Sequence, residues 1–288
     1  MLGLFTKQPP LPETSIEWLF DAFEWSLVNF GSDVFFDETQ LVSPSDKDFP
    51  AAENGVESVA QSILDRVTQH AGVAYWPCRA VDHNIADGAT DTAQSIRQVL
   101  QALPGQNQTA FEQQIQNAPA LQLFYEPLQA RNPQVMIAHY AHGIAHHLGH
   151  LATTPPPCDN EQWPHMAEAL AIYLGFGVIM ANTANPTLKG GCGGCQPSAL
   201  DRRGFLSQYE ASYALAIFCV LKDITVKEAS QYLKSDLKAF FKKAYRDASE
   251  RSEMIERLKN IRSAARFRGR TITRQFLPAM ASENTADR

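Results

Sequence analysis

Histidines are concentrated in one short stretch of this chain. Six of the eight histidines lie between His139 and His165. At 100° per residue, four of them, His139, His142, His146 and His150, fall within an arc of about 80° on a helix. Two imidazoles one turn apart can share one ion, as a zinc site requires at about 2.0–2.1 Å. His142 and His150 are about 12 Å apart along the axis, so those two cannot bind the same ion.

The sequence around these histidines predicts a helix with one core face. Asn132-Pro133 is typical of an N-cap followed by a proline in the first turn, and Pro155 to Pro157 stop the helix. The side opposite the histidines is apolar: Ile137, Ala141, Ile144, Ala145, Leu148 and Leu151. An amphipathic helix of this kind has a simpler interpretation, in which the histidines form its solvated polar side.

A second predicted helix supplies a carboxylate. Between Met166 and Ala181 the only charged residue is Glu168, and the apolar residues run all the way round the helix, which predicts burial. A buried carboxylate must be protonated, paired or bound to a metal. The histidine face, 22 residues upstream, is the obvious partner, and His, His and Glu form a recognised zinc ligand set. His165 shares the face of Glu168, either as an extra ligand or as a hydrogen-bond partner that makes a metal unnecessary.

One motif carries a family resemblance. The run Ala141-His-Gly-Ile-Ala-His-His-Leu148 resembles the Ala-His-Glu-Leu-Ala-His motif of zincin-type metallopeptidases. Further stretches, spanning about residues 14–245, are similar to an uncharacterised bacterial family of zincin-like proteins; they are Leu41-Val-Ser-Pro with Phe49-Pro50, the run from Ala171 to Asn182, and the run from Gly204 to Phe218. The resemblance implies a zincin-like fold with His142, His146 and Glu168 as zinc ligands, and a strand next to the histidine helix. His139 and His150 would lie near the metal or be exposed.

The chain departs from the zincin motif at one position. The family's glutamate after the first histidine, the general base that deprotonates metal-bound water, is Gly143 here. Our first hypothesis is a non-catalytic zincin-like protein, whose metal or buried polar cluster is structural or supports binding to a protein or peptide partner. The alternative is an active zinc hydrolase with a substitute base, for instance Glu126 or His139. A third hypothesis is a helical interaction protein without metal.

Cysteines offer one further candidate site. Cys192-Gly-Gly-Cys195 provides half of a structural zinc site, with Cys158 and Cys219 as single additional candidates. Five cysteines in 288 residues do not form the pattern of a disulfide framework, which favours a reducing cytoplasm. Cys78, beside Trp76-Pro77, is typical of a small core residue.

Composition limits the choice of partners. A net charge of −6 argues against general affinity for nucleic acid, so the basic stretch from Arg251 to Arg274 is interpreted as a solvated helix face. The N-terminus lacks the apolar run of a signal peptide. No uncharged run reaches the length of about 20 residues that a membrane span needs. We therefore expect a soluble, cytoplasmic protein.

The expected fold is a mainly helical α+β domain over residues 1–277, followed by a disordered polar tail at 278–288. Thr14-Ser-Ile-Glu17 predicts a capping box for a first helix that ends at Gly31. Residues 33–37 are predicted as a short extended piece, residues 73–81 and 120–125 as strands, and the latter leads straight into the histidine helix. Other helices are predicted at 57–70, 91–103, 207–222, 225–233, with a capping box at Thr225, and 235–265.

Overall fold

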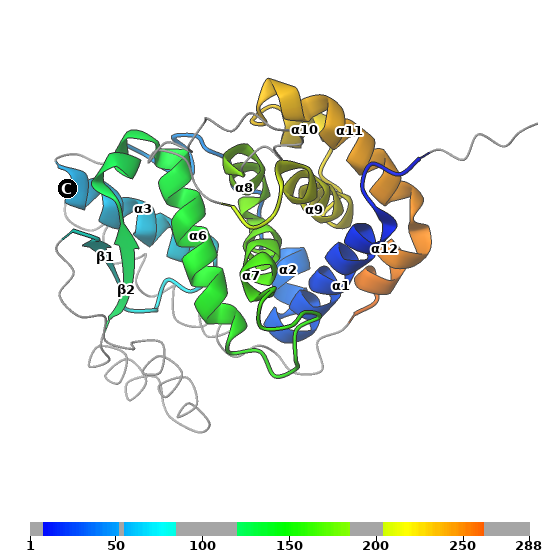
Figure 1. Cartoon of the computed structure of the whole chain (residues 1–288), viewed down its shortest axis with the longest axis horizontal. Coiled ribbons are helices and arrows are strands. Elements are labelled where there is room, and N and C mark those ends of the chain that lie inside the picture. The colour runs from blue at the N-terminus through cyan, green and yellow to red at the C-terminus, as the bar shows by residue number, and fades with distance from the viewer. Residues whose placement is uncertain (1–7, 52–54, 85–119, 185–203, 262–288) are drawn as a thin grey trace, which may run out of the picture.

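The structure is a computed structural model that describes residues 8–51, 55–84, 120–184 and 204–261 (Figure 1). Within these ranges the fold is mainly helical with a small parallel sheet, which confirms the expected α+β class. The helices are α1 (Glu13–Phe30), α2 (Ser32–Asp37), α3 (Val56–His70), α6 (Pro133–Gly149), α7 (Trp163–Ala171), α8 (Gly177–Thr183), α9 (Gln208–Leu221), α10 (Val226–Ser230), α11 (Ser235–Glu250) and α12 (Ser252–Lys259). The predicted helix at 91–103 and the predicted tail lie outside the described residues.

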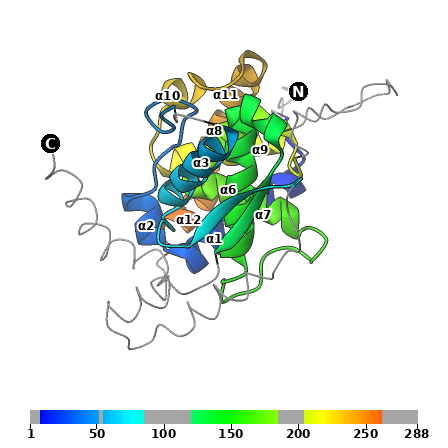
Figure 2. The same ribbon diagram turned by 90° about the vertical axis from the view of Figure 1, so that its left-hand side faces the viewer.

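The sheet lies at one end of the molecule, beside the histidine helix α6. Strands β1 (Cys78–Asp82) and β2 (Leu121–Tyr125) pair in parallel, with Cys78 opposite Leu121. Alternate residues of β2, among them Leu121 and Leu123, are buried, as the alternating sequence predicts. A short turn of 3₁₀ helix, η1 (Pro127–Arg131), separates β2 from α6, so the strand does not lead straight into the helix. Figure 2, which views this end directly, shows α3 and the strands in front of α6.

Helix α6 stands between the sheet and the rest of the helical core. Across Figure 1, α6 is followed by α7 and α8, then by α1 and α9, with α11 and α12 at the far end. The apolar face of α6 predicted from the sequence is buried, with Ala141, Ile144, Ala145 and Leu148 at 0% exposure. Glu168 on α7 is also fully buried, as predicted. The histidine face itself is only partly covered, with His139, His142 and His146 half-buried and His150 exposed.

The predicted helix from 166 to 181 is interrupted. α7 passes into a π-helical segment, η2 (Ile172–Phe176), before α8 begins. Gly175 has φ +107°, and a Cβ there would collide with the carbonyl oxygen of Gln40. The N–H of Val42 donates to the carbonyl oxygen of Gly175 at 2.9 Å. The helix is interrupted here because the segment at residues 40–42 packs against it, and the Gly175 carbonyl oxygen bonds to this segment.

Three local predictions are wrong. Residues 33–37 are helical, because they belong to α2 and pack Val34 and Phe35 into the core. Thr14 does not cap α1, since the helix begins at Glu13 after Pro12, whose fixed φ suits the start of a helix. The helix predicted at 235–265 breaks at Arg251, which lies between α11 and α12. The Arg251 guanidinium there bonds to Glu13 and Asp247, which joins the break to α1. The capping box at Thr225 and Glu228 is confirmed.

One helical run is long and apolar enough to cross a membrane by composition. It covers Trp163–Thr183, and 94% of its apolar 18-residue window is buried inside the described part of the fold. This run therefore lies in the core of the described fold.

Candidate functional site

The four histidines of the predicted face differ in the neighbours that they contact. Helix α6 begins as predicted, with Asn132 at the N-cap and Pro133 in the first turn. Nearest the sheet, His139 Nε2 lies 2.8 Å from the carbonyl oxygen of Phe124 on β2. Because a carbonyl only accepts, Nε2 carries the hydrogen, and this bond fastens α6 to the strand.

His142 is covered by an aromatic ring from another segment. The Phe205 ring stacks on the His142 ring with centroids 5.4 Å apart and planes at 18°. Phe205 also meets the His165 ring edge-on at 5.8 Å. The His142 and His146 ring centroids are 6.4 Å apart. The short segment before α9 therefore covers the middle of the histidine face.

His146 is fixed by a tryptophan. The indole N–H of Trp163 donates to His146 Nδ1 over 3.0 Å. Indole nitrogen is a donor only, so Nδ1 must be the unprotonated nitrogen and a neutral His146 carries its hydrogen on Nε2. Burial, with a smaller contribution from His150, lowers the pKa of His146, which favours this neutral form. In that tautomer neither nitrogen of His146 has a lone pair free for a metal ion.

His150 lies at the end of the helix and turns back on it. Its Nδ1 donates to the carbonyl oxygen of His146 at 2.7 Å, as a C-terminal histidine often does. The His150 ring lies 4.7 Å from the rings of both His146 and Trp163. His147, which the sequence places off the predicted face, packs its ring against His146 at 5.3 Å. The end of α6 is therefore a cluster of rings that meet edge-on or at a tilt.

The loop after this cluster is clamped to α1. Asn29 Oδ1 accepts hydrogen bonds from the backbone N–H and the hydroxyl of Thr153 and from the N–H of Thr154, at 2.9, 3.1 and 3.1 Å. The indole N–H groups of Trp25 and Trp18 donate to the carbonyl oxygens of Thr154 and Pro157, each at 2.9 Å. We call these contacts of Trp18, Trp25 and Asn29 the α1 clamp. It fixes the connection between the histidine helix and α7.

Glu168 has partners other than the histidines. Its Oε1 accepts the backbone N–H of Phe205 at 3.1 Å, and its Oε2 accepts that of Leu206 at 2.7 Å. A buried carboxylate that accepts two backbone N–H groups has hydrogen-bond partners without a metal. The segment that these bonds hold is the one whose Phe205 ring covers His142. Glu168 therefore anchors this cover to α7.

The predicted zinc ligands do not form a three-ligand set in this arrangement. Among the described residues, no group of three or more His, Cys, Asp or Glu side chains is placed to hold a metal ion. In this arrangement His146 Nδ1 accepts from an indole, and each oxygen of Glu168 accepts from one backbone amide. His165 Nδ1 is buried with no hydrogen-bond partner among the described residues. Cys192 and Cys195 lie outside the described residues, and Cys78, Cys158 and Cys219 are free thiols. Zinc binding itself stays a prediction.

Gly143 is a contact point between α6 and the sheet. The Leu123 Cδ2 atom lies 2.7 Å from the position that a Cβ on residue 143 would take. Leu123 is 6% exposed, so it belongs to the core of this end of the fold. Gly149 is the corresponding point at the other end, where the Trp163 ring occupies the space of a Cβ. Both glycines allow a neighbouring element to approach the helix closely.

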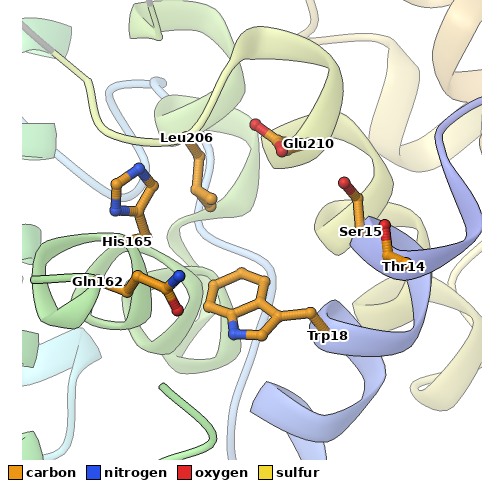
Figure 3. A pocket seen from close by; sticks show the side chains of 7 residues that line it. All are labelled: Thr14, Ser15, Trp18, Gln162, His165, Leu206 and Glu210. Atoms are coloured by element: carbon orange, nitrogen blue, oxygen red, sulfur yellow. The ribbon is translucent and has the colours of Figure 1, made fainter. Parts of the chain in front are cut away.

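A pocket that the sequence analysis did not identify lies beside the Glu168 anchor. It has a volume of about 380 Å³ and is lined by Thr14, Ser15, Trp18, Gln162, His165, Leu206 and Glu210 (Figure 3). These residues come from the first turns of α1, α7 and α9 and the residues just before α7 and α9. The one sequence signal was Ser207-Gln-Tyr-Glu210, which is a capping box: the Ser207 N–H donates to Glu210 Oε2 at 2.9 Å.

No family model, curated protein or solved structure matches the chain. The zincin-like resemblance therefore rests only on the motif and the further sequence stretches named above.

Proposed function

We propose that the protein is a non-catalytic, zincin-like protein of the cytoplasm that binds a peptide or protein partner. In this proposal the histidine and glutamate positions serve a structural purpose, which is to hold the Phe205 segment over α6. The observation that carries it is the Leu123 side chain, which fills the space beside Gly143. A glutamate at 143, the general base of zincins, has no room there unless Leu123 moves.

The contacts of the two substitute bases support the same proposal. His139 Nε2 donates to the Phe124 carbonyl oxygen. The Glu126 side chain accepts the backbone N–H of Gln129 in the capping box of η1. A general base must reach the proton that it removes, and each of these groups is already bonded to the backbone near β2. Activation of a water by either one would require those local bonds to open.

The glutamate anchor supports a structural use of the third ligand position. A buried carboxylate is costly unless it is compensated, and here the compensation comes from the N–H groups of Phe205 and Leu206. The same segment forms one wall of the pocket through Leu206. Holding this segment in place therefore also shapes the pocket, which links Glu168, a residue of the zincin-like pattern, to binding.

The test is metal content, measured by mass spectrometry on untagged protein, beside a peptide-hydrolysis panel. We expect well under one zinc per chain and no turnover. The double variant His142→Ala, His146→Ala should lower the melting temperature, because it removes the ring under Phe205 and the acceptor for Trp163. One zinc per chain that is lost in this variant, together with metal-dependent hydrolysis that is lost on mutating Glu126 or His139, would establish the active hydrolase instead.

A further inference from the structure

The pocket between the starts of α1, α7 and α9 has one charged side chain. Glu210 is half-buried and makes no ion pair within 4 Å among the described residues, while its Oε2 accepts the Ser207 N–H. The other oxygen retains its full capacity to accept hydrogen bonds. A partly buried carboxylate without a counter-ion favours a cation, and it is the clearest sign of a ligand in this pocket.

Further acidic residues lie on or next to the elements that line the pocket. Glu13 and Glu17 lie on the first two turns of α1, and Glu161 precedes α7. Glu13 is paired with Arg251, but Glu17 and Glu161 make no ion pair among the described residues. The chain as a whole carries a net charge of −6. A cationic group is therefore drawn to this side of the molecule, and an anionic one is repelled.

The apolar part of the pocket comes from Trp18 and Leu206. The Trp18 N–H is bonded to the Pro157 carbonyl oxygen, so the indole is held in one orientation by the α1 clamp. Figure 3 shows the indole projecting from α1 into the middle of the lining residues, opposite Leu206. A fixed indole offers a surface on which a flat cation can stack. Guanidinium is such a cation, and it also bonds well to a carboxylate.

We propose that this pocket binds the guanidinium group of an arginine side chain presented by a partner peptide. The guanidinium donates to the open oxygen of Glu210 and stacks on Trp18, while the hydroxyls of Thr14 and Ser15 accept further N–H groups. The aliphatic stem of the arginine packs on Leu206. This inference rests on the proposed function as a binding protein, and it names the chemistry that the partner must carry.

The experiment compares two capped amino acids by NMR titration of the full chain. The probe is N-acetyl-arginine N-methylamide, and the matched ligand is N-acetyl-citrulline N-methylamide, which has the same shape without the charge. We expect saturable binding of the arginine probe with shifts at the Trp18 indole N–H, and at least about tenfold weaker binding of the citrulline compound. The corresponding capped lysine should bind more weakly, because an ammonium cannot stack as a plane.

A pair of matched variants locates the charge. Glu210→Gln removes the charge and keeps an oxygen for the capping box, so the start of α9 should remain folded. Glu228→Gln makes the same change in the capping box of α10, which lies outside the pocket. We expect Glu210→Gln to weaken the arginine probe by at least about tenfold and Glu228→Gln to leave it unchanged.

Three results would overturn the inference: no saturable binding of the arginine probe, equal binding of arginine and citrulline, or equal weakening by the two variants. Binding of the lysine compound as tight as that of arginine would overturn the choice of guanidinium. None of these results affects metal content or hydrolysis, so this inference can fail while the non-catalytic assignment stands. Conversely, a zinc-dependent activity would refute the proposed function whatever the arginine probe does.

Discussion

Helix α6 contains two pairs of a histidine and a glycine, His139 with Gly143 and His146 with Gly149. The two pairs differ in the side chains and backbone groups that contact them. At the sheet end, His139 bonds to a backbone carbonyl, and Gly143 receives the flexible end of Leu123. At the other end, His146 accepts from an indole, and Gly149 receives the rigid face of the same Trp163. The same two residue types thus give a yielding contact at one end and a rigid one at the other. Which ring nitrogen of His139 and of His146 carries the hydrogen depends on a hydrogen-bond partner from another element. The spacing of the histidines in the sequence does not determine it.

The rigid end should be the more sensitive to added volume. In Gly149→Ala the new methyl group would overlap the Trp163 ring, and a planar ring cannot fold away as an aliphatic side chain can. We expect a loss of about 3 kcal/mol in the free energy of unfolding, from overpacking together with the lost bond to His146. Urea denaturation of the wild type and the variant, followed by tryptophan fluorescence, measures this change in the free energy of unfolding. An unchanged midpoint would show that the Trp163 contact is not rigid.

The α1 clamp should be the next most important contact at this end. Asn29→Ala leaves three donors of Thr153 and Thr154 without their acceptor, which should cost about 2 kcal/mol. Asn29→Asp keeps the oxygen that accepts from these three donors but loses the amide N–H groups that donate to the Trp25 carbonyl oxygen and the Thr154 hydroxyl, so it separates the accepting role from the donating role. Limited proteolysis between residues 151 and 157 should be faster in the alanine variant only. Equal cleavage of both variants would mean that another contact holds the loop.

Position 143, where the neighbour is the flexible Leu123 side chain, should tolerate a glycine-to-alanine change better than position 149. Gly143→Ala places a methyl group against Leu123 Cδ2, the tip of a side chain that can adopt another rotamer. We expect a loss of about 1 kcal/mol, clearly below that of Gly149→Ala. The two variants should be denatured side by side, because their order is the quantity that matters. A larger loss for Gly143→Ala than for Gly149→Ala would reverse the comparison.

The smallest effect concerns reactivity at the sheet end. Burial raises the pKa of the Cys78 thiol on β1 to about 12, so its thiolate is scarce at pH 8. Iodoacetamide should modify Cys78 very slowly there, with a rate that rises about tenfold per pH unit while the fold persists. Peptide mapping by mass spectrometry reads each cysteine separately. Cys158 provides the comparison, since burial and Asp159 raise its pKa less strongly. Rapid modification of Cys78 at pH 8 would show that this end opens in solution.

The sequence predicted the elements of the site better than their contacts. The 3.6-residue period and Pro133 located α6, the apolar run from Met166 located most of α7, and the lone charge of that run predicted the burial of Glu168. The partners of Glu168 could not be predicted in this way, because backbone N–H groups leave no mark in a sequence. The bond from Trp163 to His146 was missed for a related reason, since periodicity relates residues within one helix and says nothing of a ring on the next.

The pocket shows a further limit of sequence patterns. Its residues come from three helix starts that are far apart along the chain, and only packing brings Trp18, Gln162 and Glu210 together. The interruption at Gly175 was equally hidden, because a glycine inside an apolar run is compatible with a continuous helix. The wrong prediction for residues 33–37 has a different cause. That stretch is too short for periodicity to separate helix from strand.

The α1 clamp also has a consequence for folding during synthesis on the ribosome. Trp18, Trp25 and Asn29 are made early, but their partners lie 139, 129 and 125 residues later in the chain. At ~10 residues per second, α1 must wait on the order of ten seconds before its partners are made. During that time its tryptophans have no native contact in this loop. Contacts of such long range form late and slow the folding of a domain. The clamp that fixes the histidine helix in the finished fold is therefore expected to close among the last steps of folding, after α6 and α7 have emerged.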